Sequence, residues 1–456
     1  MKICIENIGL IKWAEFSPSN LTIICGDNNS GKTYATYAWF GFLDFFKRRY
    51  KMKIDPDFIR DFIKSGSSEY SVNRPLSHFN KIIAQACNDY ISYLPSVFAT
   101  SPDFFKEAKF NIILEKSDIK VKKSFNARFQ NKGNEVVQII KKADNENIHF
   151  SWLNSDSNEG GNASFKSLLA FIFSDVIKKV LFDNTFPEVF VTSAERTGAA
   201  VFKKDINTSS PIRDAQSENV ISRYPLPVVR NVDFINNLDI ISKRYGELSH
   251  FHPEIMNAFI RISGGEYEAE KNSGMVFFLP SGSKAKYAMA QSASSVRALL
   301  DLYFYIKHLA SENQLLIIDE PELNLHPSRQ ILLARLLTML VNCGLKVMIT
   351  THSDYILREI NNMMILNSKK NHQAVNSLLS KYDIPKKSLI DSERVSLYIA
   401  KKDLVKLKDA QRRKRIDTLV EIDKEGKYGF THTVFDKILE EAAALQRDII
   451  FSDYES

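Results

Sequence analysis

Short apolar runs alternate along this chain with longer stretches that have the apolar spacing of a helix. Residues 1–16 are typical of two short strands around a turn, and the apolar run at 21–25 (LTIIC) predicts a buried strand. The pattern then predicts helices at 32–48, 294–311 and 328–342 and strands near 187–196, 315–322 and 346–357. Residues 76–94 and 165–183 also have helical spacing, and residues 264–290 alternate like a β-meander. The order strand, helix, strand, helix indicates an α/β fold with a parallel sheet.

The same pattern suggests how the chain is divided. We expect a core of two lobes formed by residues 1–50 and 185–370, interrupted by a largely helical insertion at 50–185. Residues 371–456 are expected to form a small C-terminal α+β appendage. It would contain two strands and a final helix near 432–446.

The overall composition narrows the class of protein. Apolar residues make up 44% of the chain and charged residues 25%, which is typical of a soluble globular protein. No apolar run approaches the roughly 18 residues of a membrane span, and the first residues have no signal-peptide pattern. The four cysteines are scattered without a CxxC pair, which favours reduced, buried thiols. We therefore expect a cytoplasmic protein without a membrane partner, and its net charge of +7 permits nucleic-acid contact without requiring it.

The most specific motif follows the first buried strand. It reads GDNNSGKT and fits Gly-x-x-x-x-Gly-Lys-Thr between a strand and a helix, which is the arrangement of a phosphate-binding loop. Its glycines let backbone N–H groups point at an anion, and the following helix adds the positive end of its dipole. Lys32 is predicted to reach the β- and γ-phosphates of ATP, and the Thr33 hydroxyl to bind Mg²⁺. The predicted ATP-binding residues of this loop are Gly26, Asp27, Asn28, Asn29, Ser30, Gly31, Lys32 and Thr33.

Two adjacent carboxylates, Asp319 and Glu320, end a later apolar run in LLIIDEPE. Ligands of parallel sheets bind beyond the carboxyl ends of the strands, so Asp319 is expected beside the phosphates as a Mg²⁺ ligand. Glu320 is then placed to orient and deprotonate the attacking water. The alternative is that the two acids cap the N-terminus of the next helix.

A histidine ends the next predicted strand, in VMITTHSD. A lone histidine carries little information, but His352 follows the acidic strand by one helix, where a neighbouring strand should emerge. We expect its side chain to hydrogen-bond the γ-phosphate and to sense hydrolysis.

Together, GDNNSGKT, LLIIDEPELNLHP and VMITTHSD resemble the ABC-type ATPase fold of the SMC, Rad50 and OLD class. Within that class the chain most resembles the stand-alone ATPases of bacterial antiphage systems, such as the Septu ATPase subunit. The segment FVTSAERTG is also similar to the PAER segment of those ATPases. The motifs occur in the order of the family and span residues 1 to about 357. The resemblance implies a P-loop ATPase head that uses ATP and Mg²⁺ and that forms a homodimer or larger homo-oligomer with ATP between subunits.

The resemblance further implies a signature loop at a helix N-terminus, which contacts the nucleotide held by the other subunit. The matching stretch is AQSASSVRALLDLYF, where Ser294 or Ser295 would donate to phosphate. The paired glycines of the family are absent, and Val296 stands where a glycine is common. This departure weighs against contact in trans and against brisk turnover. The alternative is a serine N-cap on a structural helix.

Other positions are assigned by the same resemblance. Asn324 and His326 match a loop that crosses the dimer interface in this family. Arg196 would reach phosphate or the partner subunit, with a structural ion pair to Glu195 or another acid as an equal alternative. Gln85 is the candidate for the glutamine that covers the nucleotide.

The C-terminal part offers less chemistry. OLD-class relatives carry a nuclease domain with a glutamate and a nearby Asp-x-Asp for Mg²⁺, and the residues beyond 360 contain no Asp-x-Asp. We therefore expect no built-in nuclease, and the Septu resemblance implies a separate HNH nuclease as effector. Residues 401–415 hold eight Lys or Arg against two Asp, which fits a solvated charged turn better than a phosphate-backbone contact. The HFH at 250–252 is expected to bind no metal, because the sequence places no cysteine or third ligand near it.

Four functions remain open. The preferred one is a regulatory ATPase of antiphage defence that controls a separate nuclease through ATP-dependent assembly and contacts nucleic acid through that complex. The second is a DNA-repair or chromosome-associated ATPase acting directly on DNA, which long coiled-coil arms would favour; the insertion shows no sustained heptads. A transporter ATPase would need a membrane partner. A nucleotide-binding scaffold with little hydrolysis is kept open by the altered signature loop.

Overall fold

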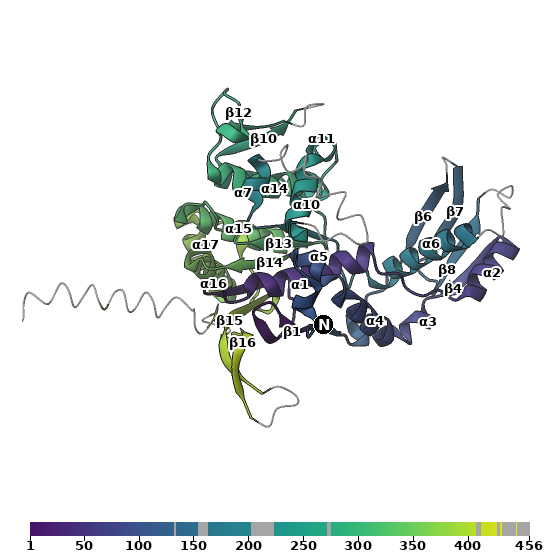
Figure 1. Ribbon diagram of the computed structural model, residues 1–456. Coiled ribbons are helices and arrows are strands. Elements are labelled where there is room, and N and C mark those ends of the chain that lie inside the picture. Colours follow the sequence, from purple (N-terminus) through teal and green to yellow (C-terminus); the bar gives the residue numbers. More distant parts are fainter. Residues whose placement is uncertain are drawn as a thin grey trace, which may run out of the picture. The chain divides into compact units, whose positions relative to one another are not determined.

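The computed structural model describes residues 1–131, 134–153, 163–201, 223–270, 275–406, 412–425, 429–430 and 444. The chain forms two compact units (Figure 1). The first unit comprises Met1 and residues 42–92 and 110–188, and the second comprises residues 2–41, 93–109 and 189–456. The division falls within helix α1 (Lys32–Arg48), whose predicted bounds are confirmed.

A six-stranded sheet lies at the centre of the second unit, with its described strands in the order β16-β15-β3-β14-β13-β9. Their bounds are β3 Leu21–Gly26, β9 Val189–Thr192, β13 Leu315–Asp319, β14 Lys346–Thr351, β15 Val395–Val405 and β16 Lys414–Glu421. Neighbours pair in parallel except β15 with β16. The predicted parallel sheet is therefore confirmed. Since β3, β14 and β13 are adjacent, the motifs that follow them emerge at one edge of the sheet.

The C-terminal part corrects one expected boundary. Strand β15 lies within the residues expected to form an appendage, but Val395–Ala400 pairs in parallel with β3 inside the core sheet. The six residues of that stretch (VSLYIA) are buried without alternation, as expected of a strand covered on both faces. The expected final helix near 432–446 lies outside the described residues, apart from residue 444.

Helices and smaller sheets complete the second unit. The helices include α5 Leu94–Phe98, α7 Arg196–Val201, α10 Leu226–Asn236, α11 Leu238–Ile241, α12 Glu247–Phe251, α13 Pro253–Ser263, α14 Ser294–His308, α15 Pro327–Asn342, α16 Asp354–Ser368 and α17 His372–Lys381. Strands β1 (Lys2–Ile8) and β2 (Ile11–Phe16) form the predicted N-terminal antiparallel pair. Strands β10 Gly265–Ala269, β11 Val276–Pro280 and β12 Tyr287–Ala288 form the predicted meander. One apolar core joins the central sheet to α13, α14, α15 and α16.

The first unit is not largely helical as expected. Four antiparallel strands form a sheet in the order β4-β8-β7-β6. The bounds are α2 Pro56–Ser65, β4 Ser67–Ser71, α3 Asn73–Leu76, α4 Phe79–Ile91, β6 Phe125–Asn131, β7 Asn134–Lys141, β8 Asn147–Trp152 and α6 Ala163–Phe182. Phe58, Phe150 and Phe173 stack edge to face or tilted and join α2, β8 and α6. Among the described residues, no helix has the length and apolar character that crossing a bilayer requires.

Candidate nucleotide-binding site

The loop between β3 and α1 depends on two glycines for its shape. Gly26 and Gly31 have φ angles of +140° and +95°, which side chains with a Cβ rarely adopt. A Cβ on Gly26 would lie 2.5 Å from the Ala400 carbonyl oxygen, and one on Gly31 would lie 2.8 Å from Ile11 Cγ1. Neither position leaves room for a side chain larger than that of glycine. The backbone path therefore explains why the motif has glycine at both positions.

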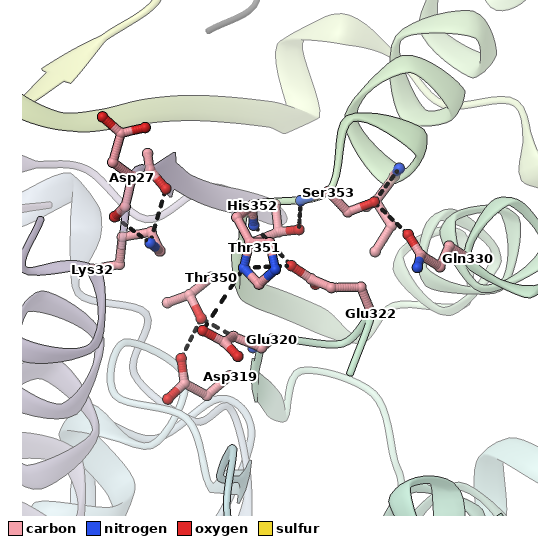
Figure 2. A network of polar contacts seen from close by, with 12 residues as sticks. Asp27, Lys32, Asp319, Glu320, Glu322, Gln330, Thr350, Thr351, His352 and Ser353 are labelled. Atoms are coloured by element: carbon pink, nitrogen blue, oxygen red, sulfur yellow. Dashed lines mark hydrogen bonds and ion pairs between the residues drawn. The ribbon is translucent and has the colours of Figure 1, made fainter. Parts of the chain in front are cut away.

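This loop gathers the groups that a phosphate requires. Lys32 is 6% exposed, and its ammonium donates to the carbonyl oxygens of Gly26 (2.9 Å) and Asp27 (2.8 Å), so the ammonium lies over the loop itself (Figure 2). Lys32 is also the first residue of α1, whose leading N–H groups lack intrahelical partners. The Ser30 hydroxyl oxygen is buried and has no hydrogen-bond partner among the described residues. A cation, a helix N-terminus and an unpaired hydroxyl together fit a bound phosphate.

Asp319, at the end of β13, stands beside this loop. The Thr33 hydroxyl oxygen lies 3.4 Å from both carboxylate oxygens of Asp319. Tyr37 donates to the carboxylate at 2.9 Å, and Thr350 donates to it from the end of β14 (Figure 2). Burial raises the pKa of Asp319, while the hydrogen bonds from Thr350 and Tyr37 oppose that rise. A carboxylate next to a hydroxyl supplies the hard oxygen ligands that Mg²⁺ prefers.

Two of these partners were missed in the sequence. Tyr37 follows Thr33 by four residues on α1, which places both side chains on one helix face. Thr350 is paired with Asp319 in the β13–β14 register. The alternative role of the acids as helix caps is not found, because the N-cap of α15 is His326.

Glu320 and His352 face each other across the ends of β13 and β14. Glu320 has a left-handed backbone conformation (φ +51°), and its N–H donates to the carbonyl and hydroxyl oxygens of Thr350 at 3.1 Å. Its carboxylate lies 3.8 Å from Nδ1 of His352. Backbone strain of this kind concentrates at functional sites.

Glu322 holds His352 and was not anticipated. Its Oε1 accepts from the His352 backbone N–H at 2.8 Å and lies 3.3 Å from Nδ1 of the same residue (Figure 2). Glu322 is buried, and burial raises its pKa, while hydrogen bonding from the His352 backbone opposes the rise. The second glutamate of the DEPE sequence, three positions after Asp319, was the available signal.

A cavity of about 430 Å³ brings these groups together. It is lined by Leu10, residues 28–34, Glu320 and His352. Its size lies in the range of about 300–1,000 Å³ of small-molecule sites. The phosphate loop, Glu320 and His352, which were predicted from three distant motifs, thus share one site.

The serines of the predicted signature loop do not line this cavity. They begin α14, whose N-cap residue is Ala293 and which has no side-chain cap. The alternative of a serine N-cap is therefore not found. Ser294 is exposed, as are Asn324 and His326 of the predicted interface loop. The exposed N-terminus of α14 keeps its leading N–H groups available to an anion.

Comparison with known proteins identifies the family of this site. The model of the AAA_15 family, described as an AAA ATPase domain, matches residues 1–357. The chain belongs to this AAA ATPase family. The match includes the phosphate loop, Asp319, Glu320 and His352, which are the residues of the site just described. A search of the curated proteins found no match.

Three solved structures similar to this AAA ATPase are SMC head domains. An SMC head bound to the C-winged helix domain of ScpA is 12% identical, with 93% of this chain and 97% of that chain covered and a TM-score of 0.36. The SMC head domain from Thermotoga maritima is 12% identical, with 92% and 98% covered and a TM-score of 0.31. An SMC head with an extended coiled coil, bound to the C-terminal domain of ScpA and derived from Pyrococcus furiosus, is 10% identical, with 98% of both chains covered and a TM-score of 0.32.

Arg196 of the ATPase lies behind the site rather than in the cavity. It is 3% exposed and donates to the carbonyl oxygens of Asp319 (2.7 Å) and Glu320 (2.8 Å). Its Nε donates to the Ala298 carbonyl oxygen of α14 at 2.9 Å. These contacts are with main-chain oxygens, not with the carboxylate of Glu195. Arg196 therefore ties α14 to the end of β13.

Gln85, the candidate for covering the nucleotide, belongs to the first unit. Its side-chain amide donates to Asp89 on the same helix at 2.7 Å. Its role stays a prediction.

Asp301 of α14 is a buried acid, and we expect it to make the free energy of unfolding depend on pH. Neither carboxylate oxygen has a hydrogen-bond partner among the described residues, and burial raises its pKa to about 7, against the opposing charge of Arg196. Because its pKa is raised in the folded state, ionisation of Asp301 destabilises the fold as pH rises from about 4 to 7. Asp301→Asn, which cannot ionise, is expected to be about 1–3 kcal/mol more stable than wild type at pH 8.

Urea unfolding of both proteins across this pH range measures the effect. The advantage of Asp301→Asn should shrink as the pH is lowered towards 4, because the wild-type carboxyl becomes neutral in both states. A difference that stays constant with pH would show that Asp301 does not titrate in this window.

Proposed function

We propose that this AAA ATPase is an ATP-driven assembly switch, in which a second copy completes the nucleotide site. One observation carries the proposal: Ser294, which is exposed, and Ser295 begin a helix without a side-chain cap and are absent from the lining of their own chain's cavity. A nucleotide in that cavity would present its γ-phosphate outward to the α14 N-terminus of another copy. A head-to-tail pair of this kind contains two such composite sites.

The residues of the cavity have separate roles in this scheme. Bound ATP supplies the γ-phosphoryl group as the electrophile. Lys32 would neutralise phosphate charge, and Thr33 and Asp319 would hold Mg²⁺. Glu320 would orient the attacking water and accept its proton, while His352, held by Glu322, would contact the γ-phosphate. Hydrolysis removes the group that binds both copies and so loosens the pair.

The biological setting that we propose is antiphage defence, with this chain as the regulatory subunit of a separate effector nuclease. The support is the resemblance of its motifs to the Septu ATPase subunit, which implies an HNH nuclease as the effector. Such an effector would engage the ATP-bound assembly and be released on hydrolysis.

The experiment that tests the switch is measurement of molar mass in solution, using Glu320→Gln to retain ATP. Light scattering after size exclusion should give a dimer or larger assembly with ATP and Mg²⁺ and a smaller species with ADP. The effector should co-purify only with the ATP form. A mass that does not respond to nucleotide would rule out the switch, whereas assembly without any nuclease bound would rule out only the effector.

A second function, direct action on DNA, is favoured by the β15–β16 hairpin. Exposed basic residues gather on its described part: Lys401, Lys402, Lys406, Arg412, Arg413, Lys414 and Arg415. Fluorescence anisotropy with duplex DNA at two salt concentrations would distinguish this function, because phosphate contacts weaken steeply with salt.

A further inference from the structure

Three side chains that the nucleotide site does not use meet beside α13 and α15 of the second unit. His252 is the N-cap residue of α13, and Glu254 lies in its first turn. Cys343 is the C-cap residue of α15. One potential ligand atom from each residue lies within 4.8 Å of the other two. The sequence predicted no metal at HFH for want of a nearby cysteine, and the fold supplies that cysteine from a distant segment.

The separations within this cluster suit a small tetrahedral ion. His252 Nδ1 lies 3.6 Å from Glu254 Oε1. Zn²⁺ binds nitrogen and oxygen at about 2.0–2.2 Å and sulfur at about 2.3 Å, which places tetrahedral ligands about 3.3–3.7 Å apart. The two ligand atoms are therefore close to the required spacing without a direct hydrogen bond between them.

The cluster also contains an unsatisfied ring nitrogen. His252 Nδ1 is inaccessible to solvent and has no hydrogen-bond partner among the described residues. Leaving a polar atom in this state costs free energy, which a metal bond would recover. Cys343 is 7% exposed, so its thiol lies inside the fold rather than on the surface.

We propose that His252, Glu254 and Cys343 bind a zinc-like divalent ion, with water as the fourth ligand. A nitrogen, an oxygen and a sulfur ligand match a borderline-soft metal better than Mg²⁺ or Ca²⁺. Cys343 lies at the C-terminus of α15, where the negative end of the helix dipole favours a cation. The ion would join α13 to α15 and thereby fix the helix that follows the Asp319–Glu320 segment.

Lys387 is the natural competitor of the metal. Its ammonium forms an ion pair with Glu254, and 56% of its side chain is exposed, so it can turn into solvent. Burial raises the pKa of the Cys343 thiol; Glu254 and Glu312 add to the rise, and Lys387 opposes it. Metal binding must then release the thiol proton, and affinity should increase with pH.

Titration of the metal-stripped full chain with Zn²⁺, and separately with Co²⁺, tests the site. We expect one Zn²⁺ per chain and a thiolate-to-cobalt absorption band with Co²⁺. His252→Gln, Glu254→Gln and Cys343→Ser should each weaken Zn²⁺ binding at least about tenfold. Cys343→Ser should also remove the band, and Lys387→Gln should tighten binding.

The matched control is His250→Gln, which removes the other histidine of HFH. His250 is exposed and stacks on Tyr245, outside the cluster, so this variant should bind Zn²⁺ like wild type. Thermal unfolding of every metal-free variant checks that its fold is intact. If the substitution of buried Cys343 prevents folding, Glu254→Gln, which changes a partly exposed side chain, still tests the site. Failure of wild type to retain Zn²⁺, or a cobalt band that survives Cys343→Ser, would overturn the proposal.

Discussion

Glu320→Gln is expected to reduce ATP turnover by about 10²–10⁴-fold while leaving ATP binding nearly unchanged. The substitution keeps the size of the side chain and removes the carboxylate that would accept a proton from the attacking water. Glu320 lines the cavity but is not among the residues that cradle the phosphates. Phosphate release measures turnover, and a fluorescent ATP analogue measures binding on the same preparation.

The matched control for this prediction is Glu312→Gln. Glu312 is exposed in the turn that precedes β13, at the opposite end of the strand from Glu320. It should hydrolyse ATP at the wild-type rate. Unchanged turnover in Glu320→Gln would remove Glu320 from the mechanism, and absence of turnover in wild type itself would favour a nucleotide-binding scaffold.

Lys32→Met is expected to weaken ATP binding about 100-fold or more, corresponding to about 3 kcal/mol. Methionine keeps most of the buried aliphatic part of the side chain but removes the ammonium. In the wild-type chain that ammonium is held over the loop by hydrogen bonds to the carbonyl oxygens of Gly26 and Asp27. Without that charge, the β- and γ-phosphates lose their main counter-ion. Isothermal titration calorimetry with ATP and Mg²⁺ measures the loss directly.

An exposed lysine of the same unit controls for the change in net charge. Lys12 on β2 is exposed and does not line the cavity. Lys12→Met should bind ATP like wild type, and thermal unfolding should show that both variants are folded. ATP affinity that is equal in Lys32→Met and Lys12→Met would place the phosphates elsewhere.

The parts of the site that could be predicted are those that local sequence determines. Gly26 and Gly31 are required by the backbone path of a short loop, and Lys32 begins a helix whose bounds follow from local apolar spacing. Asp319 and His352 each end a short apolar strand, and parallel pairing carries both ends to one edge. Each of these features can be predicted from residues that are neighbours in the sequence.

The parts that could not be predicted depend on contacts between distant segments. The sequence left Arg196 open between a contact to phosphate or a partner subunit and a structural ion pair, but tertiary packing directs its guanidinium to carbonyl oxygens of Asp319 and Ala298. Strand β15 resembled an appendage, because nothing local indicates that it pairs with β3. His252 resembled an isolated histidine until the fold placed Cys343 beside it. In each case the missing information was the position of a partner far away in the chain.

The central claim is that one copy's Lys32 loop and another copy's α14 N-terminus share a nucleotide, and mixing two inactive variants tests it most directly. Lys32→Met keeps an intact α14 N-terminus, whereas Ser295→Arg keeps an intact loop and obstructs the neighbour's nucleotide. Each variant alone should hydrolyse no ATP. An equimolar mixture should recover about a quarter of the wild-type rate, because half of the random pairs contain one complete site of two. A mixture as inactive as its two components, or a Ser295→Arg variant that is fully active by itself, would contradict the claim.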